Sequence, residues 1–238
     1  MNVLFQALGH AAFPCIATLI AGLVALRKTP GEKAQGFIQH FAAGVVLSAA
    51  AGEILPEIKA SHSAFELIVG FAGGVFAMLV IRALSERGNE SEGKKSPTSL
   101  LITVAIDIFL DGALIGLGFA AGQKTGLLLT VALTLELMFL GLSTSTTLLR
   151  NGVSKGRVML NLAALCVLLL MGTGVGAGLL GLLPHSGLVI ALSFGLAALL
   201  FLVVEELLVE AHEVKETAWS SASFFAGFLC LTVIEMST

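Results

Sequence analysis

Long apolar stretches alternate with short polar connections along the whole chain. Eight stretches of about 20 residues or slightly more carry little charge, and a helix of about 20 residues crosses about 30 Å of hydrocarbon. Over such lengths only a helix satisfies its own backbone hydrogen bonds in lipid, because barrel strands would be shorter and would alternate. We therefore predict an all-α polytopic membrane protein with transmembrane helices at Val3–Leu26, Gln35–Leu55, Ala64–Ala83, Ser99–Ala121, Gly126–Leu149, Val158–Leu183, Leu188–Leu208 and Ala218–Met236.

Composition agrees with this pattern. Hydrophobic residues make up 56% of the 238 residues and charged residues only 12%. A soluble domain of this length needs far more charge to cover its surface. We expect residues 1–238 to form one transmembrane domain, with a flexible cytoplasmic loop at about 85–97, and the first span to stay uncleaved. Each of the three cysteines stands alone within a span and is expected to be a small packing residue: Cys15, Cys166 and Cys230.

The basic residues are distributed unevenly between the connections. All but Lys59 and Lys124 of the 13 lysines and arginines lie in the odd-numbered connections. Positively charged residues of short loops stay in the cytoplasm. The odd connections are therefore predicted to face the cytoplasm, which places both termini outside.

The second and seventh spans share a spacing of residues. In each, a Phe is followed twelve positions later by the first of two glutamates four apart: Phe41, Glu53 and Glu57, and then Phe194, Glu206 and Glu210. The two spans run in opposite directions in the predicted topology. We therefore predict inverted triple-helix repeats on either side of spans four and five, a 3+2+3 arrangement that is common in secondary transporters.

The middle spans carry the candidate chemistry. The only two aspartates, Asp107 and Asp111, lie four residues apart on one face of span four, and Glu136 lies near the middle of span five. An ionised carboxylate at this depth costs several kcal/mol unless it is paired, hydrated or bound to a metal. Spans four and five contain no Lys, Arg or His to neutralise these acids. The cluster therefore predicts either a cation site or a set of shared protons.

Further acidic residues lie near the ends of the spans. Those at outer ends form a predicted pathway entrance: Glu53, Glu57 and Glu235. Those at the inner end of span seven, with a histidine, form a predicted exit: Glu205, Glu206, Glu210 and His212. Taken singly, such terminal acids are more often solvated helix ends, so this interpretation depends on the central cluster.

With these residues assembled, the chain resembles the ZIP (Zrt/Irt-like) family of divalent-metal permeases over nearly its whole length. The resemblance rests on the eight spans, on Gly44–Glu57 in span two, on Glu205–Glu210 in span seven, and on the acid-and-glycine motifs of the middle spans. It implies metal ligands at two sets of positions: Asp107, Ile108 and Asp111, and then Glu136, Leu137 and Leu140.

The chain departs from the family pattern at several of these positions. Asp107 and Glu136 stand where the family carries other ligands, and four usual ligand positions are apolar: Ile108, Leu137, Leu140 and Leu169. The resemblance therefore implies that one of two adjacent metal positions is kept with carboxylates alone, and that the second is lost.

Three functions fit this sequence. The first is a permease for divalent cations of the Zn, Mn or Fe class, with the metal as transported ligand and no cofactor; oxygen ligands favour harder ions such as Mn²⁺, Fe²⁺ and Mg²⁺, although zinc also binds carboxylates. The others are a proton-coupled carrier of a non-metal solute and a non-transporting protein of the same fold. An enzyme is not expected, because an intramembrane aspartyl protease brings its acids from two helices. We expect a multi-pass protein of the cell membrane (inner or plasma membrane), with lipid as its surroundings, a homodimer as a possible assembly, and no nucleic-acid partner.

Overall fold

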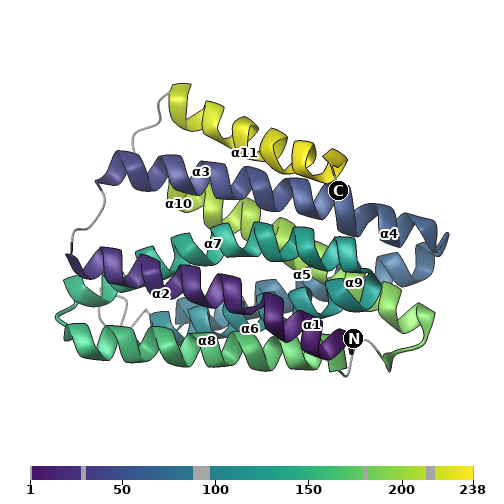
Figure 1. The fold of residues 1–238 in the computed structure, drawn as a ribbon, viewed down its shortest axis with the longest axis horizontal. Coiled ribbons are helices and arrows are strands. Elements are labelled where there is room, and N and C mark those ends of the chain that lie inside the picture. Colours follow the sequence, from purple (N-terminus) through teal and green to yellow (C-terminus); the bar gives the residue numbers. More distant parts are fainter. Residues whose placement is uncertain (1, 28–30, 88–96, 179–181, 213–217, 238) are drawn as a thin grey trace.

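The computed structural model describes residues 2–27, 31–87, 97–178, 182–212 and 218–237, and these residues form a bundle of helices (Figure 1). Within the described chain, eight helical runs are long and apolar enough to cross a membrane, as predicted. The elements are α1 (Val3–His10), α2 (Ala12–Arg27), α3 (Glu32–Ala49), η1 (Ala50–Ile54), α4 (Leu55–Ala60), α5 (Ala64–Arg87), α6 (Pro97–Ala121), α7 (Gln123–Arg150), α8 (Lys155–Gly178), α9 (His185–Phe201), η3 (Leu202–Leu207), α10 (Leu208–His212) and α11 (Ala218–Ser237).

Several predicted helix boundaries differ from those of the structure by a few residues. The sixth span is α8, which the structure describes as far as Gly178; residues 179–181 lie outside the described residues, and Leu183, the predicted end, lies in a bend before Pro184 and not in the helix. The loop predicted at about 85–97 begins later, since α5 continues to Arg87. The rest of that predicted loop, residues 88–96, lies outside the described residues.

The first span bends where α1 meets α2. Ala11 separates the two helices, and Pro14 follows in the first turn of α2. Proline has no N–H, so the His10 carbonyl lacks its usual helical donor. The span bends at the position that this missing hydrogen bond predicts.

The second and seventh spans each contain a wide π-helical turn: η1 continues from α3 into α4, and η3 continues from α9 into α10. Pro56 follows η1 and has no N–H for the Gly52 carbonyl, which favours a wider turn there. The corresponding position after η3 is Val209, so a proline is not required for the turn. Both turns carry glutamates, Glu53 in η1 and Glu205 with Glu206 in η3.

Four helix pairs make the most extensive contacts: α6 with α8, α2 with α7, α3 with α11, and α5 with α9. Glycines allow these close approaches. A Cβ atom on Gly172 of α8 would lie 2.1 Å from the Phe109 carbonyl oxygen of α6, and one on Gly227 of α11 would lie 2.1 Å from the Phe41 carbonyl oxygen of α3. The helix backbones therefore lie in contact at these points.

The outer helices of the bundle expose large apolar side chains, as expected for a surface in lipid. Phe65 and Phe76 of α5 are 73% and 69% exposed, and Phe225 of α11 is 69% exposed. Helices α6 and α7 are buried much more deeply, and they carry the central carboxylates. Figure 1 shows α11 at the edge of the bundle and α7 within it.

Candidate metal centre

A tight helical hairpin brings the central carboxylates to one depth. Helices α6 and α7 are joined by Gly122 alone, and they approach closely near the turn, where a Cβ on Gly118 would lie 3.2 Å from the Cα of Gly126. Gly122 lies nearly midway in sequence between Asp107 and Glu136. An antiparallel pair with such a short link therefore places these two acids side by side.

The structure brings Asp107, Asp111 and Glu136 together. One carboxylate oxygen from each lies within 4.8 Å of an oxygen from each of the others. Two oxygens that share an ion at about 2.1 Å are at most about 4.2 Å apart. Three oxygens spread evenly around such an ion are about 3.6 Å apart, so a closing movement of at most about 1.2 Å would let all three coordinate one cation.

These carboxylates are buried and only partly satisfied. Asp107 is 8% exposed, and Asp111 and Glu136 are each 2% exposed. Among the described residues, Asp111 Oδ2 and Glu136 Oε2 have no hydrogen-bond partner. A buried polar atom without a partner costs several kcal/mol when it is charged, so these two oxygens are well suited to receive a cation.

Glu206 of η3 is a fourth acid of this region. It interacts electrostatically with both Asp111 and Glu136. Sequence reasoning assigned it to the inner exit, because spacing along one span does not show which neighbouring helix a side chain faces. Its half-buried carboxylate adds negative charge beside the central cluster.

The neighbouring glutamate has a different partner. Glu205 forms an ion pair with Arg82 of α5, and both side chains are well exposed, at 38% and 48%. Successive helical residues point in different directions, so one turn presents Glu205 to α5 and Glu206 to the centre. For the other two residues of the predicted exit, Glu210 and His212, the backbone belongs to α10 and the side chains lie outside the described residues.

The predicted outer entrance contains two residues that lie together and one that does not. Glu53 is 8% exposed, its Oε2 accepts a hydrogen bond from the Thr125 hydroxyl at 3.3 Å, and it interacts with Glu235. The Glu235 carboxylate lies so close to Gly52 that a Cβ there would be 2.4 Å from its Oε2. Glu57, one turn further along, is exposed.

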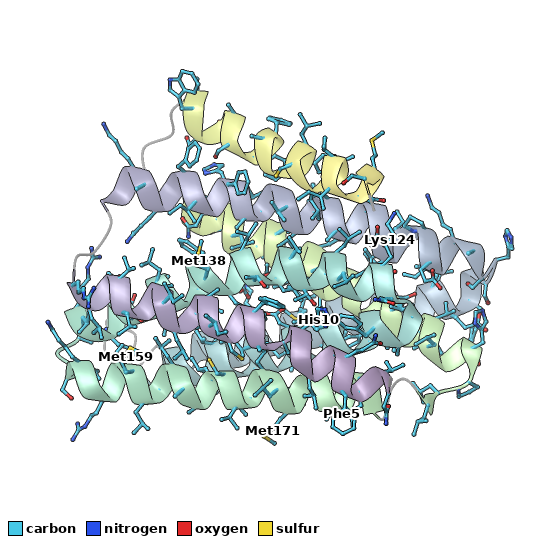
Figure 2. All side chains as sticks on the ribbon, viewed as in Figure 1. Phe5, His10, Lys124, Met138, Met159 and Met171 are labelled. Carbon is cyan, nitrogen blue, oxygen red and sulfur yellow. The ribbon has the colours of Figure 1, made fainter. Side chains whose placement is uncertain are left out.

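Sequence reasoning missed two residues at this end of the molecule. Thr125 donates to Glu53, and the Lys124 ammonium donates to the Glu235 backbone carbonyl at 3.0 Å. Figure 2 places Lys124 between α7 and the far end of the second span, beside α4. Their position directly after the Gly122 link was the available signal, because a tight hairpin turn brings the first turn of α7 to the end of the bundle.

The positions at which the resemblance implied lost ligands lie in the apolar core. Ile108, Leu137 and Leu169 are each 2% exposed or less, and all belong to the principal cluster of buried apolar side chains. Leu140 packs against that cluster. All four of these positions carry apolar side chains, so the carboxylates stand beside apolar side chains.

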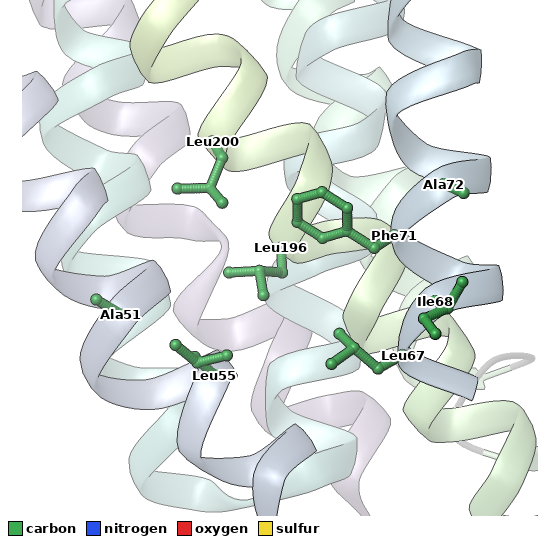
Figure 3. A pocket seen from close by; sticks show the side chains of 8 residues that line it. All are labelled: Ala51, Leu55, Leu67, Ile68, Phe71, Ala72, Leu196 and Leu200. Atoms are coloured by element: carbon green, nitrogen blue, oxygen red, sulfur yellow. The ribbon is translucent and has the colours of Figure 1, made fainter. Parts of the chain in front are cut away.

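A groove near η1 is separate from this centre. It has a volume of about 490 Å³ and lies between the second, third and seventh spans (Figure 3). Its lining is wholly apolar: Ala51, Leu55, Leu67, Ile68, Phe71, Ala72, Leu196 and Leu200. Its side chains offer no oxygen ligand, unlike the carboxylate cluster of α6 and α7.

Comparison with known proteins does not assign the chain to a family. A scan against models of protein families finds no match for the chain, and a search of curated proteins finds no matching relative.

Proposed function

We propose that the chain is a membrane transporter of divalent metal cations, similar to ZIP permeases, with Asp107, Asp111 and Glu136 as the binding site. The observation that carries this proposal is the pair of buried oxygens, Asp111 Oδ2 and Glu136 Oε2, without a donor among the described residues. Three convergent carboxylates offer oxygen ligands alone, which favours hard cations such as Mn²⁺, Fe²⁺ and Mg²⁺ over softer ones. The cation is the transported ligand, and no cofactor is proposed.

The inverted 3+2+3 arrangement is the second part of this proposal. In this arrangement, spans one, two and three correspond to spans six, seven and eight, and span four corresponds to span five. The contact between α6 and α8 then corresponds to the contact between α7 and α2. The contact between α3 and α11 corresponds to the contact between α9 and α5. All four pairs are among the most extensive helix contacts. The π-helical turns also correspond, since the spacing that relates Glu53 to Glu206 carries Ala50–Ile54 onto residues 203–207, within η3.

Glycine contacts repeat with the same spacing. Gly227 lies against the Phe41 carbonyl, and Gly74 lies against the Phe194 carbonyl. Gly74 is separated from Gly227 by as many positions as Phe41 is from Phe194. Equivalent atoms therefore meet in both halves, as a pseudo-two-fold relation requires.

We further propose that both termini lie outside the cell membrane. The two termini lie at the same end of the bundle in Figure 1, as an even number of spans requires. The lysines and arginines concentrate in the connections at the other end, which supports a cytoplasmic position for that end. In a variant without native cysteines, Ser154→Cys should resist impermeant thiol reagents in intact cells and Ser186→Cys should react; the opposite labelling would contradict this orientation.

Uptake into proteoliposomes tests the transport function. The purified protein should take up at least one of Mn²⁺, Fe²⁺, Mg²⁺ and Zn²⁺, and Asp111→Asn should abolish that uptake. Repeating the assay with a pH gradient separates metal transport from proton-coupled transport of another solute. Absence of both uptake and stabilisation by every ion of the panel would contradict the proposal.

A further inference from the structure

Two cysteines far apart in the sequence meet inside the bundle. Cys15 of α2 and Cys166 of α8 face each other, and each thiol donates to the backbone carbonyl of the other, at 3.7 and 3.6 Å. Cys15 is 8% exposed and Cys166 is half-buried. Both cysteines pack in the apolar core, as the sequence predicted, but their contact with each other was not predicted, because they lie on helices that are far apart in the sequence.

The reciprocal contact follows from the positions of the two residues in the fold. Cys15 is separated from Cys166 by as many positions as Thr18 is from Leu169. The Thr18 carbonyl lies against Gly141 of α7, and the Leu169 carbonyl lies against Gly112 of α6. The cysteines thus occupy equivalent positions on α2 and α8, at the point where these helices meet, and their sulfurs point toward each other's backbone.

Sulfur chemistry decides what this pair can bind. A thiol is a weak hydrogen-bond donor, so exchanging two thiol–carbonyl contacts for metal–sulfur bonds gives up little. Soft sulfur ligands select cations such as Cu⁺ over the hard ions that carboxylates prefer. Two donors from facing helices also match ions that accept only two ligands.

We propose that Cys15 and Cys166 form a second cation site, which takes a soft two-coordinate ion of the Cu⁺ or Ag⁺ class between α2 and α8. Binding follows M⁺ + 2 RSH → RS–M–S(H)R + H⁺: one thiol releases its proton to solvent, and both sulfurs bond to the ion. The bridge carries no net charge, which suits a site inside a membrane, where net charge is costly. No oxidant or reductant takes part.

Native mass spectrometry of the detergent-solubilised protein with Ag⁺ as the probe tests this site, since Ag⁺ does not oxidise thiols. The wild type should hold one tightly bound Ag⁺. Cys15→Ser and Cys166→Ser should each lose it, whereas Cys230→Ser should keep it, because Cys230 is exposed on α11. Asp111→Asn should also keep it, which separates the thiol pair from the carboxylate centre. Retention in either of the first two variants, or loss in Cys230→Ser, would overturn the proposal.

A second measurement needs no substitution and therefore does not depend on the folding of a variant. One equivalent of Ag⁺ should protect two of the three thiols of the wild type from alkylation by a maleimide, leaving Cys230 to react. Protection of one thiol, or of none, would show that no bridge forms and would overturn the site.

Discussion

The two π-helical turns occupy corresponding positions in the bundle but have different surroundings. In η1, Glu53 accepts a hydrogen bond from Thr125 and interacts with Glu235, near the Lys124 ammonium. In η3, Glu206 interacts with the central acids instead, and Glu205 is paired with Arg82. The two turns thus share their π-helical backbone, whereas their charge environments differ.

This difference shows how two similar helical turns come to have unequal electrostatic surroundings. At the η1 end, the glutamate has a hydroxyl donor and a cation nearby, so its charge is partly compensated within the protein. At the η3 end, Glu206 faces other carboxylates, so its charge adds to that of the centre. A cation bound by Asp107, Asp111 and Glu136 is expected to be attracted more strongly by η3 than by η1.

Removing the central charge should have the largest effect. Asp111→Asn and Glu136→Gln keep the shape of each side chain but remove a ligand charge, so divalent-metal affinity should fall by about 100-fold or more, since even outer-shell changes cost 10–100-fold. Mn²⁺ should raise the thermal midpoint of the wild type, and much less that of each variant. Without metal, both variants should be at least as stable as the wild type, because a buried charge is gone. Glu66→Gln, at the start of α5, is the matched control. If Mn²⁺ raised the thermal midpoint equally in the wild type and all three variants, the proposed site would be contradicted.

The glycine contacts test whether the two halves pack alike. Gly74→Ala and Gly227→Ala each place a methyl group against a carbonyl oxygen of the facing helix, at 2.6 and 2.1 Å before any adjustment. Each should lower the free energy of unfolding by about 1–3 kcal/mol, the range for overpacked positions. Gly73→Ala is the control, because nothing lies within 4 Å of its Cβ position. Thermal unfolding in detergent measures all three, and a harmless Gly227→Ala would break the correspondence between the halves.

The different surroundings of Glu53 and Glu206 predict a moderate difference between their effects on Mn²⁺ affinity. Glu206→Gln should weaken Mn²⁺ binding at the centre by about tenfold, or about 1.4 kcal/mol. This is the size expected when one negative charge near the cation is lost and its attraction to the cation is partly screened. Glu53→Gln should weaken it clearly less, because Glu53 contacts Thr125 and lies beside Lys124. Isothermal titration of both variants measures the difference, and equal losses would mean that the two ends are electrostatically equivalent.

The ion pair between Arg82 and Glu205 should matter least for stability. Arg82 and Glu205 are both well exposed, and ion pairs of this kind contribute about 0–1 kcal/mol. Arg82→Ala should therefore shift the free energy of unfolding by less than about 1 kcal/mol, and high salt should remove the difference. A large, salt-independent loss measured by thermal unfolding would show that α5 and η3 are held together by this contact.

Much of the architecture follows from the sequence. The apolar stretches located eight membrane-spanning helices, because each helix must satisfy its backbone internally and show lipid an apolar surface. Asp107, Asp111 and Glu136 were predictable as a cluster, since helical spacing and a short link fix their relative depth. These features depend on local spacing, which the sequence records directly.

Other contacts depend on how distant helices rotate against each other. Thr125 as the donor to Glu53, the pairing of Glu205 with Arg82, and the meeting of Cys15 with Cys166 all join separate spans. The spacing of residues along a single helix does not show how that helix is rotated against a distant one. The π-helical turns were also missed: Pro56 was an available signal for η1, whereas Val209, at the corresponding position after η3, offers none.

The single-residue link at Gly122 has a consequence for biosynthesis. Each aspartate near the centre of a span opposes membrane insertion by about 2.5–3.5 kcal/mol on insertion scales, so α6, which carries two, is a poor candidate to insert alone. Only one residue separates α6 from α7, so we expect the two helices to enter the bilayer as a pair. The acids then reach the lipid already facing each other and shielded by two apolar helices. Lengthening the link should reduce the yield of inserted protein before it changes anything that the finished protein does.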